Sequence, residues 1–585
     1  MDENLINDSD ACAEYIYSDD YISFLVKYDE DLQGVYDKLN PACVTIVNSQ
    51  FLVAYKRKSE ELSGNLFRYG YGLLPKCYGL MDMTGIIATG ADRVRTLPGL
   101  SLTGRGTLIG FVDTGIDYTN PLFRNPDGTS RIEAIWDQTE EAVGTGELVF
   151  GYGAEYTKQD IDAALASPEP YLSVPTRDEN GHGTFLASVA AGGVDLQNDF
   201  SGMAPDCGIV MVKLKQVRRD IREFYLINED VPCYGEDDIL LGVKYLIMKA
   251  ILLRRPIIIC IGLGTNQGDH NGNTNLELYL DTIVNLRGVC AVAAGGNELG
   301  FGNHYSGNNR AASDSFQDRM EISVGENDRG FTMEIWGNAP GLLKISILSP
   351  TGELFDNISP IRDGGTLAAF IYEGTEVLIE NTVVESVSGD QLIFLRFQNP
   401  AQGIWTINVR ESSEFVGRGF DAWLPIHDFM NSDTRFVRPD PDITLCAPGN
   451  GRGAITVAGY NHNTRALYVN SSRGYTRKGN IKPDIAGPSV NVYGAFARSG
   501  GASSAEPLFT RMDGTSVGAA FTAGAASMIM EWAFVKGNNP SINTESIKQM
   551  LIRGANQVAD LSYPNRSWGW GALDIYGTFD AMRNL

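Results

Sequence analysis

The sequence predicts an α/β fold: a parallel sheet with helices on both faces, preceded by a small α+β unit and interrupted by an all-β insertion. Three observations lead to this prediction. From about Gly104, continuous apolar runs alternate with segments of helical periodicity, which is the rhythm of βαβ units. Residues 1–81 precede this region with a different mixture of short segments. Residues 315–439 interrupt it with short alternating segments separated by turns.

The N-terminal region, residues 1–81, is expected to form a compact α+β unit. Alternating runs favour strands, and spacing of three to four residues favours helices. The expected elements are strands at 22–28, 43–47 and 51–55, helices at 29–39 and 60–69, and an extended segment at 72–82.

The region from Gly104 onward carries the expected parallel sheet. Continuous apolar runs are typical of strands that are covered on both faces. The expected strands are 107–112, 209–214, 256–262, 289–293 and 455–459, and the expected helices are 183–191, 237–253, 275–286 and 515–532. Ligands of such sheets bind at the carboxyl ends of the strands, so functional residues are expected there.

The all-β insertion divides the α/β region into two parts, residues 82–314 and residues 440–585. Within 315–439, segments such as 343–348 and 404–409 are short and roughly alternating, and helical periodicity is absent. This pattern predicts a β-sandwich or a jelly roll.

The composition is that of a folded, acidic protein. Hydrophobic residues make up 43% and charged residues 20% of the 585 residues, and the formal net charge is -25. Such a surface repels phosphate backbones, so nucleic-acid binding is not expected. Residues 1–30 lack the basic and apolar runs of a Sec signal peptide, and the most apolar window, 251–261, is too short to span a bilayer. We therefore expect cytoplasmic synthesis and no membrane span.

The eight cysteines are spread along the chain, and none form a C-x-x-C pair. Two of them, Cys260 and Cys290, lie in strongly apolar expected strands. We expect free and mostly buried thiols rather than a disulfide framework or a zinc site.

Three local motifs place reactive side chains at the ends of expected elements. Asp113 follows an apolar strand in Phe-Val-Asp-Thr-Gly, His182 opens a helix in Asn-Gly-His-Gly-Thr, and Ser516 opens another in Gly-Thr-Ser-Val-Gly. A serine hydroxyl becomes a nucleophile when a histidine takes its proton, and a buried carboxylate orients that histidine. Each residue alone also fits a structural role: a turn-capping carboxylate, a satisfied histidine or a loop serine. Together, in this order and setting, they predict a catalytic triad.

These motifs resemble those of the subtilisin-like (S8) serine proteases, and the resemblance extends over the chain with the insertion as an elaboration. It implies that Asp113 orients His182, that His182 is the general base and that Ser516 is the nucleophile. It also implies that Asn297, in Ala-Ala-Gly-Gly-Asn-Glu, donates its side-chain N–H to the oxyanion. The structural alternative for Asn297 is a turn-forming asparagine.

The resemblance also implies a substrate-binding segment at Gly262, Leu263 and Gly264, an edge strand whose backbone would pair with an extended peptide. The family usually has Ser at the place of Gly262. Gly518 and Phe521 replace the usual Ala and His in the helix that follows the nucleophile. These departures concern fine geometry rather than the triad.

Residues 1–81 resemble a subtilase propeptide, which implies a domain that assists folding and leaves its C-terminal tail in the cleft. We expect autocleavage near the bond between Met81 and Asp82. The alternative is a permanent domain that is not cut. The expected partners are therefore the chain's own propeptide and a protein substrate bound as an extended peptide.

The order of propeptide, catalytic segments and β insertion resembles the Csp-type germination proteases of spore-forming clostridia. This resemblance implies limited proteolysis of a spore-cortex hydrolase precursor and a spore-associated protein. Two alternatives remain: an ordinary bacterial subtilase with a β insertion, and a catalytically silent binding protein whose propeptide plugs the cleft. No cofactor is expected. Calcium sites are common in the family, but the sequence places none.

Overall fold

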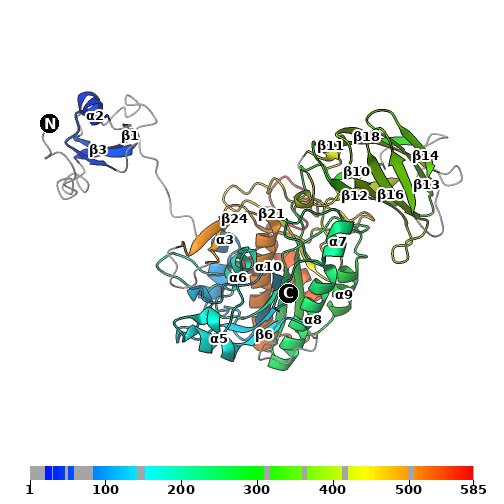
Figure 1. Ribbon diagram of the computed structural model, residues 1–585. Helices are drawn as coiled ribbons and strands as arrows, with labels where there is room; N and C mark the ends of the chain where they lie inside the picture. The colour runs from blue at the N-terminus through cyan, green and yellow to red at the C-terminus, as the bar shows by residue number, and fades with distance from the viewer. Residues whose placement is uncertain are drawn as a thin grey trace. The chain divides into compact units, whose positions relative to one another are not determined.

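The computed structural model describes residues 20–28, 31–46, 51–57, 84–140, 152–307, 317–358, 365–411, 419–431, 433–498 and 506–583 (Figure 1). The chain divides into two compact units, residues 1–81 and 82–585. The expected helix at 60–69 and the whole of the expected extended segment at 72–82, which includes Met81 and Asp82, lie outside the described residues.

The described part of the first unit is a three-stranded antiparallel sheet with one helix, in the strand order β1-β3-β2. Its elements are β1 (Tyr21–Lys27), α2 (Leu32–Leu39), β2 (Cys43–Ile46) and β3 (Phe51–Arg57). Asp31 caps α2 by accepting a hydrogen bond from the backbone N–H of Gly34 at 2.9 Å. Cys43 is disulfide-bonded, so the expectation of a free thiol is wrong at this position. Cys207, Cys233, Cys260, Cys290 and Cys446 are free and buried.

An eight-stranded sheet forms the centre of the second unit, and all of its neighbouring strands are parallel except β5 and β6. In spatial order the strands are β22 (Ile485–Pro488), β21 (Ile455–Tyr460), β9 (Val289–Ala294), β8 (Ile257–Ile261), β4 (Leu108–Asp113), β7 (Gly208–Lys213), β5 (Ile132–Asp137) and β6 (Ala154–Thr157). The predicted parallel sheet is therefore present, and it places β4 between β8 and β7.

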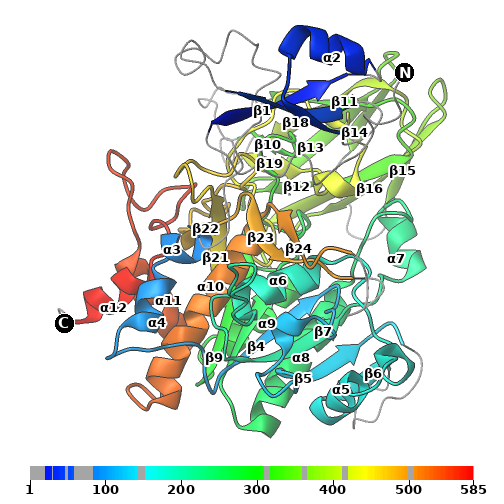
Figure 2. The same ribbon diagram turned by 90° about the vertical axis from the view of Figure 1, so that its left-hand side faces the viewer.

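Helices cover both faces of this sheet, as the continuous apolar runs predict. They are α3 (Thr84–Ala88), α4 (Ala91–Thr96), α5 (Lys158–Leu165), α6 (His182–Ala191), α7 (Arg219–Phe224), α8 (Glu236–Leu253), α9 (Asn275–Ile283), α10 (Thr515–Met530), α11 (Thr544–Gly554) and α12 (Ile575–Arg583). A short hairpin, β23 (Val492–Ala495) and β24 (Phe509–Met512), adjoins α6. Figure 2 shows α6 and α10 side by side.

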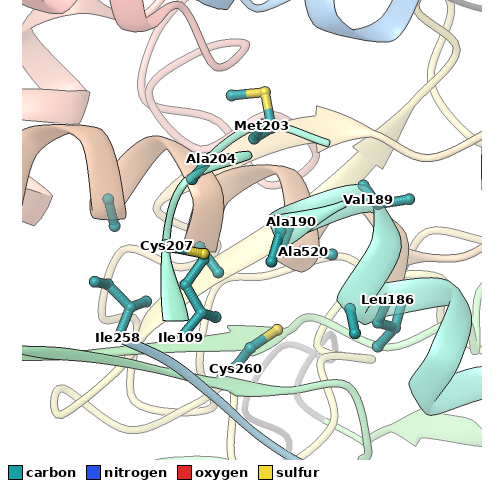
Figure 3. Packing of buried hydrophobic residues seen from close by; sticks show 14 of the residues in the cluster. Ile109, Leu186, Val189, Ala190, Met203, Ala204, Cys207, Ile258, Cys260 and Ala520 are labelled. Atoms are coloured by element: carbon teal, nitrogen blue, oxygen red, sulfur yellow. The ribbon is translucent and has the colours of Figure 1, made fainter. Parts of the chain in front are cut away.

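Successive residues of the central strands point to opposite layers of the core. In β8, Ile258 and Cys260 join the cluster under α6 and α10, whereas Ile257 and Ile259 join the cluster under α8 and α9. Figure 3 shows residues of the first of these layers, among them Leu186 and Ala190 from α6 and Ile109, Ile258 and Cys260 from the strands. Both faces of the sheet are thus covered by apolar side chains, and the functional polar residues are expected at the strand ends.

The inserted region forms two antiparallel sheets around a separate apolar core. One sheet has the order β10 (His304–Ser306), β19 (Phe420–Trp423), β12 (Gly330–Gly337), β17 (Gln391–Gln398), β16 (Thr375–Thr382) and β15 (Thr366–Phe370). The other has the order β14 (Leu354–Ile358), β13 (Leu343–Leu348), β18 (Gly403–Glu411), β11 (Gln317–Val324) and β20 (Arg435–Phe436). The all-β character agrees with the prediction. The first strand of the sheet, β10, lies before the expected boundary at residue 315, and local sequence did not reveal it because its pairing partner β19 is distant in the chain.

Polar contacts join the inserted sheets to the α/β core. Buried Arg477 pairs with Asp390, and the Arg396 guanidinium donates to the backbone carbonyl of Phe224 at 2.7 Å. The rings of Phe224 and Phe394 also stack, with centroids 5.6 Å apart. The two parts of the second unit are therefore held by side chains from both.

One helical stretch, Thr515–Val535, is long and apolar enough to cross a membrane by composition alone, and 89% of its most apolar window is buried inside the protein. The α-helix ends at Met530, two residues before the predicted end, and a π-helical turn, Glu531–Val535, continues it. Glu531 accepts backbone hydrogen bonds from Thr103, Gly104 and Arg105. This contact between distant segments explains why local periodicity misplaced the end.

Candidate active site

Asp113 stands at the carboxyl end of β4, where its side chain is almost completely buried. One carboxylate oxygen, Oδ1, accepts the backbone N–H of Thr114 at 2.8 Å and lies 2.7 Å from His182 Nδ1. The other oxygen, Oδ2, is buried and has no hydrogen-bond partner among the described residues. The strand end therefore presents one well-held carboxylate to the histidine ring.

His182 opens α6, and glycines on both sides permit its position. Gly181 has φ 89°, a left-handed conformation that side chains disfavour. A Cβ at Gly183 would lie 2.2 Å from the carbonyl oxygen of Gly115, so only glycine lets this helix approach the turn after β4. The two glycines thus bring the imidazole against Asp113.

Asp178 organises the start of the same helix, although the sequence analysis did not single it out. Its two carboxylate oxygens accept hydrogen bonds from Gly181 N at 2.8 Å, Thr184 N at 2.9 Å and the Thr114 hydroxyl at 2.9 Å. An aspartate shortly before a helix is a capping signal, and this one links the turns that carry Asp113 and His182.

Ser516 is the second residue of α10, and its Oγ lies 3.1 Å from His182 Nε2. Gly514 precedes the helix at φ 145°, and a Cβ there would lie 3.2 Å from Ser516 Oγ and 3.6 Å from Asn297 Nδ2. A side chain at Gly514 would therefore enter the space between nucleophile and amide. Asp113, His182 and Ser516 form one connected row, with the imidazole between carboxylate and hydroxyl.

The surroundings of the imidazole favour its protonated form. Burial acts to lower the pKa of His182, but the charge and hydrogen bond of Asp113, helped by Asp178, raise it above its ordinary value. This arrangement suits a base that receives a proton from Ser516 and holds it while the adjacent carboxylate compensates the charge.

Asn297 follows β9 and meets the start of α10. Its Oδ1 accepts the backbone N–H of Thr515 at 3.0 Å and the Thr515 hydroxyl at 3.1 Å. The Thr515 hydroxyl oxygen in turn accepts the N–H of Gly296 at 3.0 Å. Because Oδ1 is held in this way, Nδ2 faces the space beside Ser516. Together with the backbone N–H of Ser516 at the beginning of α10, this amide can stabilise an oxyanion. Thr515 is the positioning residue that motif reading missed.

The segment Gly262, Leu263 and Gly264 follows directly after the end of β8 at Ile261 and is not itself a strand, so its pairing with an extended substrate stays a prediction. A Cβ at Gly262 would lie 3.0 Å from His182 Cε1 and 3.1 Å from Asp113 Oδ2. A Cβ at Gly264 would lie 2.9 Å from Cys446 Cβ. The first glycine thus borders the histidine–carboxylate pair, and the second adjoins a buried cysteine.

Cys446 lies between the two backbone segments that flank the nucleophile. Its Sγ would be 2.5 Å from a Cβ at Gly296, and its backbone N–H donates to the carbonyl of Gly295 at 3.0 Å. Burial raises the pKa of the thiol well above its ordinary value, so the group stays protonated. Among the described residues, no group of three or more His, Cys, Asp or Glu side chains is placed to hold a metal ion.

The chain is similar to known proteins in both sequence and structure. The model of the subtilase family (peptidase S8) matches residues 104–383 and 437–571, which is more than half of the chain. Subtilisin-like protease SBT3.6 of Arabidopsis thaliana is 22% identical over 482 residues, covering 73% of this chain and 56% of that protein. The chain therefore spans little more than half the length of this plant relative.

Solved structures give a second comparison. The CspB protease of Clostridium perfringens is 28% identical, has a TM-score of 0.73, and matches 86% of this chain and 99% of its own chain. Sphericase is similar more weakly, at 15% identity and a TM-score of 0.40, with 83% of this chain and 97% of its own chain covered.

Proposed function

Because this chain belongs to the subtilase family, we propose that it is a serine endopeptidase in which Asp113, His182 and Ser516 form the catalytic triad. One observation carries the proposal: His182 Nε2 lies 3.1 Å from Ser516 Oγ while Nδ1 lies 2.7 Å from Asp113. A proton can pass from hydroxyl to imidazole without any other group moving.

In the proposed reaction, Ser516 Oγ attacks the carbonyl carbon of a peptide bond as His182 Nε2 takes its proton. The carbonyl oxygen becomes an oxyanion, which Asn297 Nδ2 and the backbone N–H of Ser516 stabilise. His182 then gives its proton to the leaving amine. Water repeats the sequence to release the acyl group. The chain supplies nucleophile, base and donors, so this chemistry needs no cofactor.

The experiment that tests this function is labelling with a fluorophosphonate, which reacts only with an activated serine. We expect wild type and a Ser562→Ala control, altered on an exposed turn, to be labelled, and Ser516→Ala to remain unlabelled. Equal labelling of wild type and Ser516→Ala, or no labelling of the wild type after removal of residues 1–81, would refute the proposed nucleophile.

We further propose that residues 1–81 are a propeptide that the enzyme removes by cutting near Met81 and Asp82. The compact α+β unit that ends at Met81 supports this proposal. N-terminal sequencing and intact mass decide it: wild type should be shortened and Ser516→Ala should keep its full length. If both keep full length in a protein that reacts with fluorophosphonate, the N-terminal unit is a permanent domain.

The proposed biological role is limited proteolysis of a spore-cortex hydrolase precursor during germination, by a spore-associated enzyme. The likeness to CspB protease and the combination of N-terminal unit and inserted sheets support it. Incubation with such a purified precursor should give one shortened product with wild type and none with Ser516→Ala. Extensive degradation, or no cut in this precursor by an enzyme that hydrolyses peptides, would contradict this role.

A catalytically silent binding protein is the second candidate, and the unpaired oxygen of Asp113 is the observation that favours it. Such a protein would bind its partner with the same cleft but fail to label with fluorophosphonate. We favour the enzyme because the hydroxyl, both ring nitrogens and the carboxylate lie in a connected row.

A further inference from the structure

Glu298, the residue directly after Asn297, is held by a residue from the far end of the inserted domain. Its carboxylate lies 2.9 Å from His427 Nδ1 and accepts the backbone N–H of His427 at 2.9 Å. The Asn303 side chain donates to the same carboxylate at 2.7 Å. Glu298 is buried, with 4% of its surface exposed, so this carboxylate is satisfied from within the protein.

His427 begins a short 3-10 turn, His427–Phe429, that follows β19. Its ring stacks on Phe301 at 3.8 Å, and its Nε2 lies 3.2 Å from Asp428 Oδ1. Both ring nitrogens therefore face carboxylate oxygens. A neutral imidazole can donate to only one of them, so the geometry favours the imidazolium. Burial acts to lower the pKa of His427, but Glu298 and Asp428 raise it above its ordinary value.

The segment 297–303, which we call the oxyanion loop, is incompletely packed on another side. A cavity of about 430 Å³ is lined by its residues Glu298, Leu299, Gly300, Gly302 and Asn303. Gly300 and Gly302 have φ of 94° and 77°, so the loop's backbone is built from residues with wide conformational freedom. Backbone hydrogen bonds, such as that from Leu299 N–H to the carbonyl of Asn470 at 3.1 Å, hold part of the loop, and the contact of Glu298 with His427 adds a side-chain anchor from the inserted domain.

We propose that the ion pair of Glu298 with His427 positions the oxyanion loop, so that Asn297 keeps its amide where the oxyanion forms. His427 is a positioning residue, and through it the inserted domain controls the rate of the chemical step. The inference rests on the proposed peptidase function. It implies that detachment of the 427–429 turn would lower activity without touching the triad.

The pair also gives activity an upper pH limit. A histidine whose pKa is raised in the folded protein contributes its stabilisation at low pH and loses it as pH rises through that raised pKa. His182 imposes the opposite requirement, because it must be neutral to act as a base. The two titrations therefore act in opposite directions: deprotonation of His182 raises kcat/KM, and deprotonation of His427 lowers it.

The test is a double-mutant cycle with a chromogenic peptide substrate. His427→Gln should lower kcat about ten-fold with little change in KM, and should remove the fall at high pH. In an Asn297→Ala background the same substitution should have almost no effect, because the amide it positions is gone. His462→Gln, on the turn after β21, is the matched control and should behave like wild type. Equal losses in both backgrounds would overturn the proposal.

A gentler variant keeps the proposal testable if His427→Gln does not fold. Asp428 is largely exposed, with 69% of its side chain accessible, so Asp428→Asn should leave the core intact. It should move the high-pH fall to lower pH, because one of the two charges that hold the proton is removed. If the fall of kcat/KM at high pH is unchanged in Asp428→Asn, the proposed role of His427 is wrong.

Histidine NMR separates this inference from the proposed function. The ring proton of His427, assigned by its loss in His427→Gln, should titrate above a free histidine in wild type, and at lower pH in Asp428→Asn. This result would support the ion pair even if fluorophosphonate does not label Ser516, an outcome that refutes the peptidase alone. Titration of His427 like a free histidine in an active enzyme would refute the ion pair alone.

Discussion

The triad and the junction with the inserted domain both pair a partly buried histidine with a carboxylate, but they give the second ring nitrogen different partners. His182 places Nδ1 2.7 Å from Asp113 and Nε2 3.1 Å from a hydroxyl. His427 places Nδ1 2.9 Å from Glu298 and Nε2 3.2 Å from a second carboxylate. An imidazole between carboxylate and hydroxyl can exchange a proton, whereas one between two carboxylates keeps it. The partner of the second ring nitrogen, rather than the shared carboxylate, therefore distinguishes a catalytic histidine from a structural one.

A third pair, His304 with Asp421, extends the comparison into the inserted sheet. His304 Nε2 lies 3.3 Å from Asp421 Oδ1, and the ring stacks on Trp423 with centroids 4.7 Å apart. Both partners are almost fully buried. No hydroxyl is hydrogen-bonded to Nδ1 of His304 within the described residues. This pair has the carboxylate of a triad but nothing to activate, so its contribution is to stability.

The largest expected effect comes from removing the carboxylate charge in the triad. Asp113→Asn should lower kcat about 10⁴-fold, because an amide favours the wrong imidazole tautomer while keeping the shape. The matched change in the inserted sheet, Asp421→Asn, should leave kcat of the folded protein near wild type and lower its unfolding free energy by about 1–3 kcal/mol. Peptide hydrolysis and thermal unfolding of both variants measure this contrast. Similar kcat losses in the two variants would contradict the distinction between a catalytic and a structural histidine–carboxylate pair.

The next effect concerns the amide beside the nucleophile. Asn297→Ala should lower kcat about 10²- to 10³-fold with little change in KM, because Nδ2 meets the substrate oxygen only when it becomes charged. Steady-state kinetics with one peptide substrate measures both constants. A rise in KM at constant kcat would place Asn297 in ground-state binding instead.

A smaller loss is expected at Thr515, which orients that amide. Thr515→Val removes the hydroxyl that lies 3.1 Å from Asn297 Oδ1 but keeps the backbone N–H at 3.0 Å, so we expect about a ten-fold lower kcat. Thr515→Ser, which restores a hydroxyl, should recover most of the activity. If Thr515→Ser is as slow as Thr515→Val, packing of the methyl group rather than the hydrogen bond is responsible.

Sequence patterns predicted the features of the fold that depend on residues close together in the chain. Continuous apolar runs predicted the strands and their burial, and the motifs around Asp113, His182 and Ser516 predicted three side chains at element ends that the structure brings together. Strand direction explains part of this success, because the carboxyl ends of parallel strands share one edge and Asp113 ends β4, whereas His182 and Ser516 lie at the beginnings of helices. The roles of these residues remain predictions until the variants are measured.

Local sequence patterns did not predict contacts between segments that are distant in the chain. The local sequence of His427 resembles no catalytic motif, yet Glu298 lies 129 positions away and contacts it at 2.9 Å. The end of α10 and the early start of the inserted sheet depend likewise on distant partners, Thr103 and Trp423 respectively. Local periodicity carries no information about such pairings, which form only when the fold does.

The smallest expected effect tests the glycine that borders the pair of His182 and Asp113. In wild type, kcat/KM should rise with pH as His182 loses its proton, with a midpoint above that of a free histidine because Asp113 raises its pKa. A Cβ at Gly262 would lie 3.1 Å from the unpaired Asp113 Oδ2, so the hydroxyl of Gly262→Ser can donate to that oxygen.

A donor on Asp113 spreads its charge and leaves less of it for the imidazolium, so the rise in kcat/KM should move to slightly lower pH. Gly262→Ala is the control for crowding, since its Cβ would meet a Leu186 methyl carbon at 2.6 Å without supplying a donor. The pH profiles of the two variants measure the difference. A shift to higher pH in Gly262→Ser, or the same shift in both variants, would contradict this prediction. Contact with Leu186, rather than the added hydroxyl, would then control the pairing of His182 with Asp113.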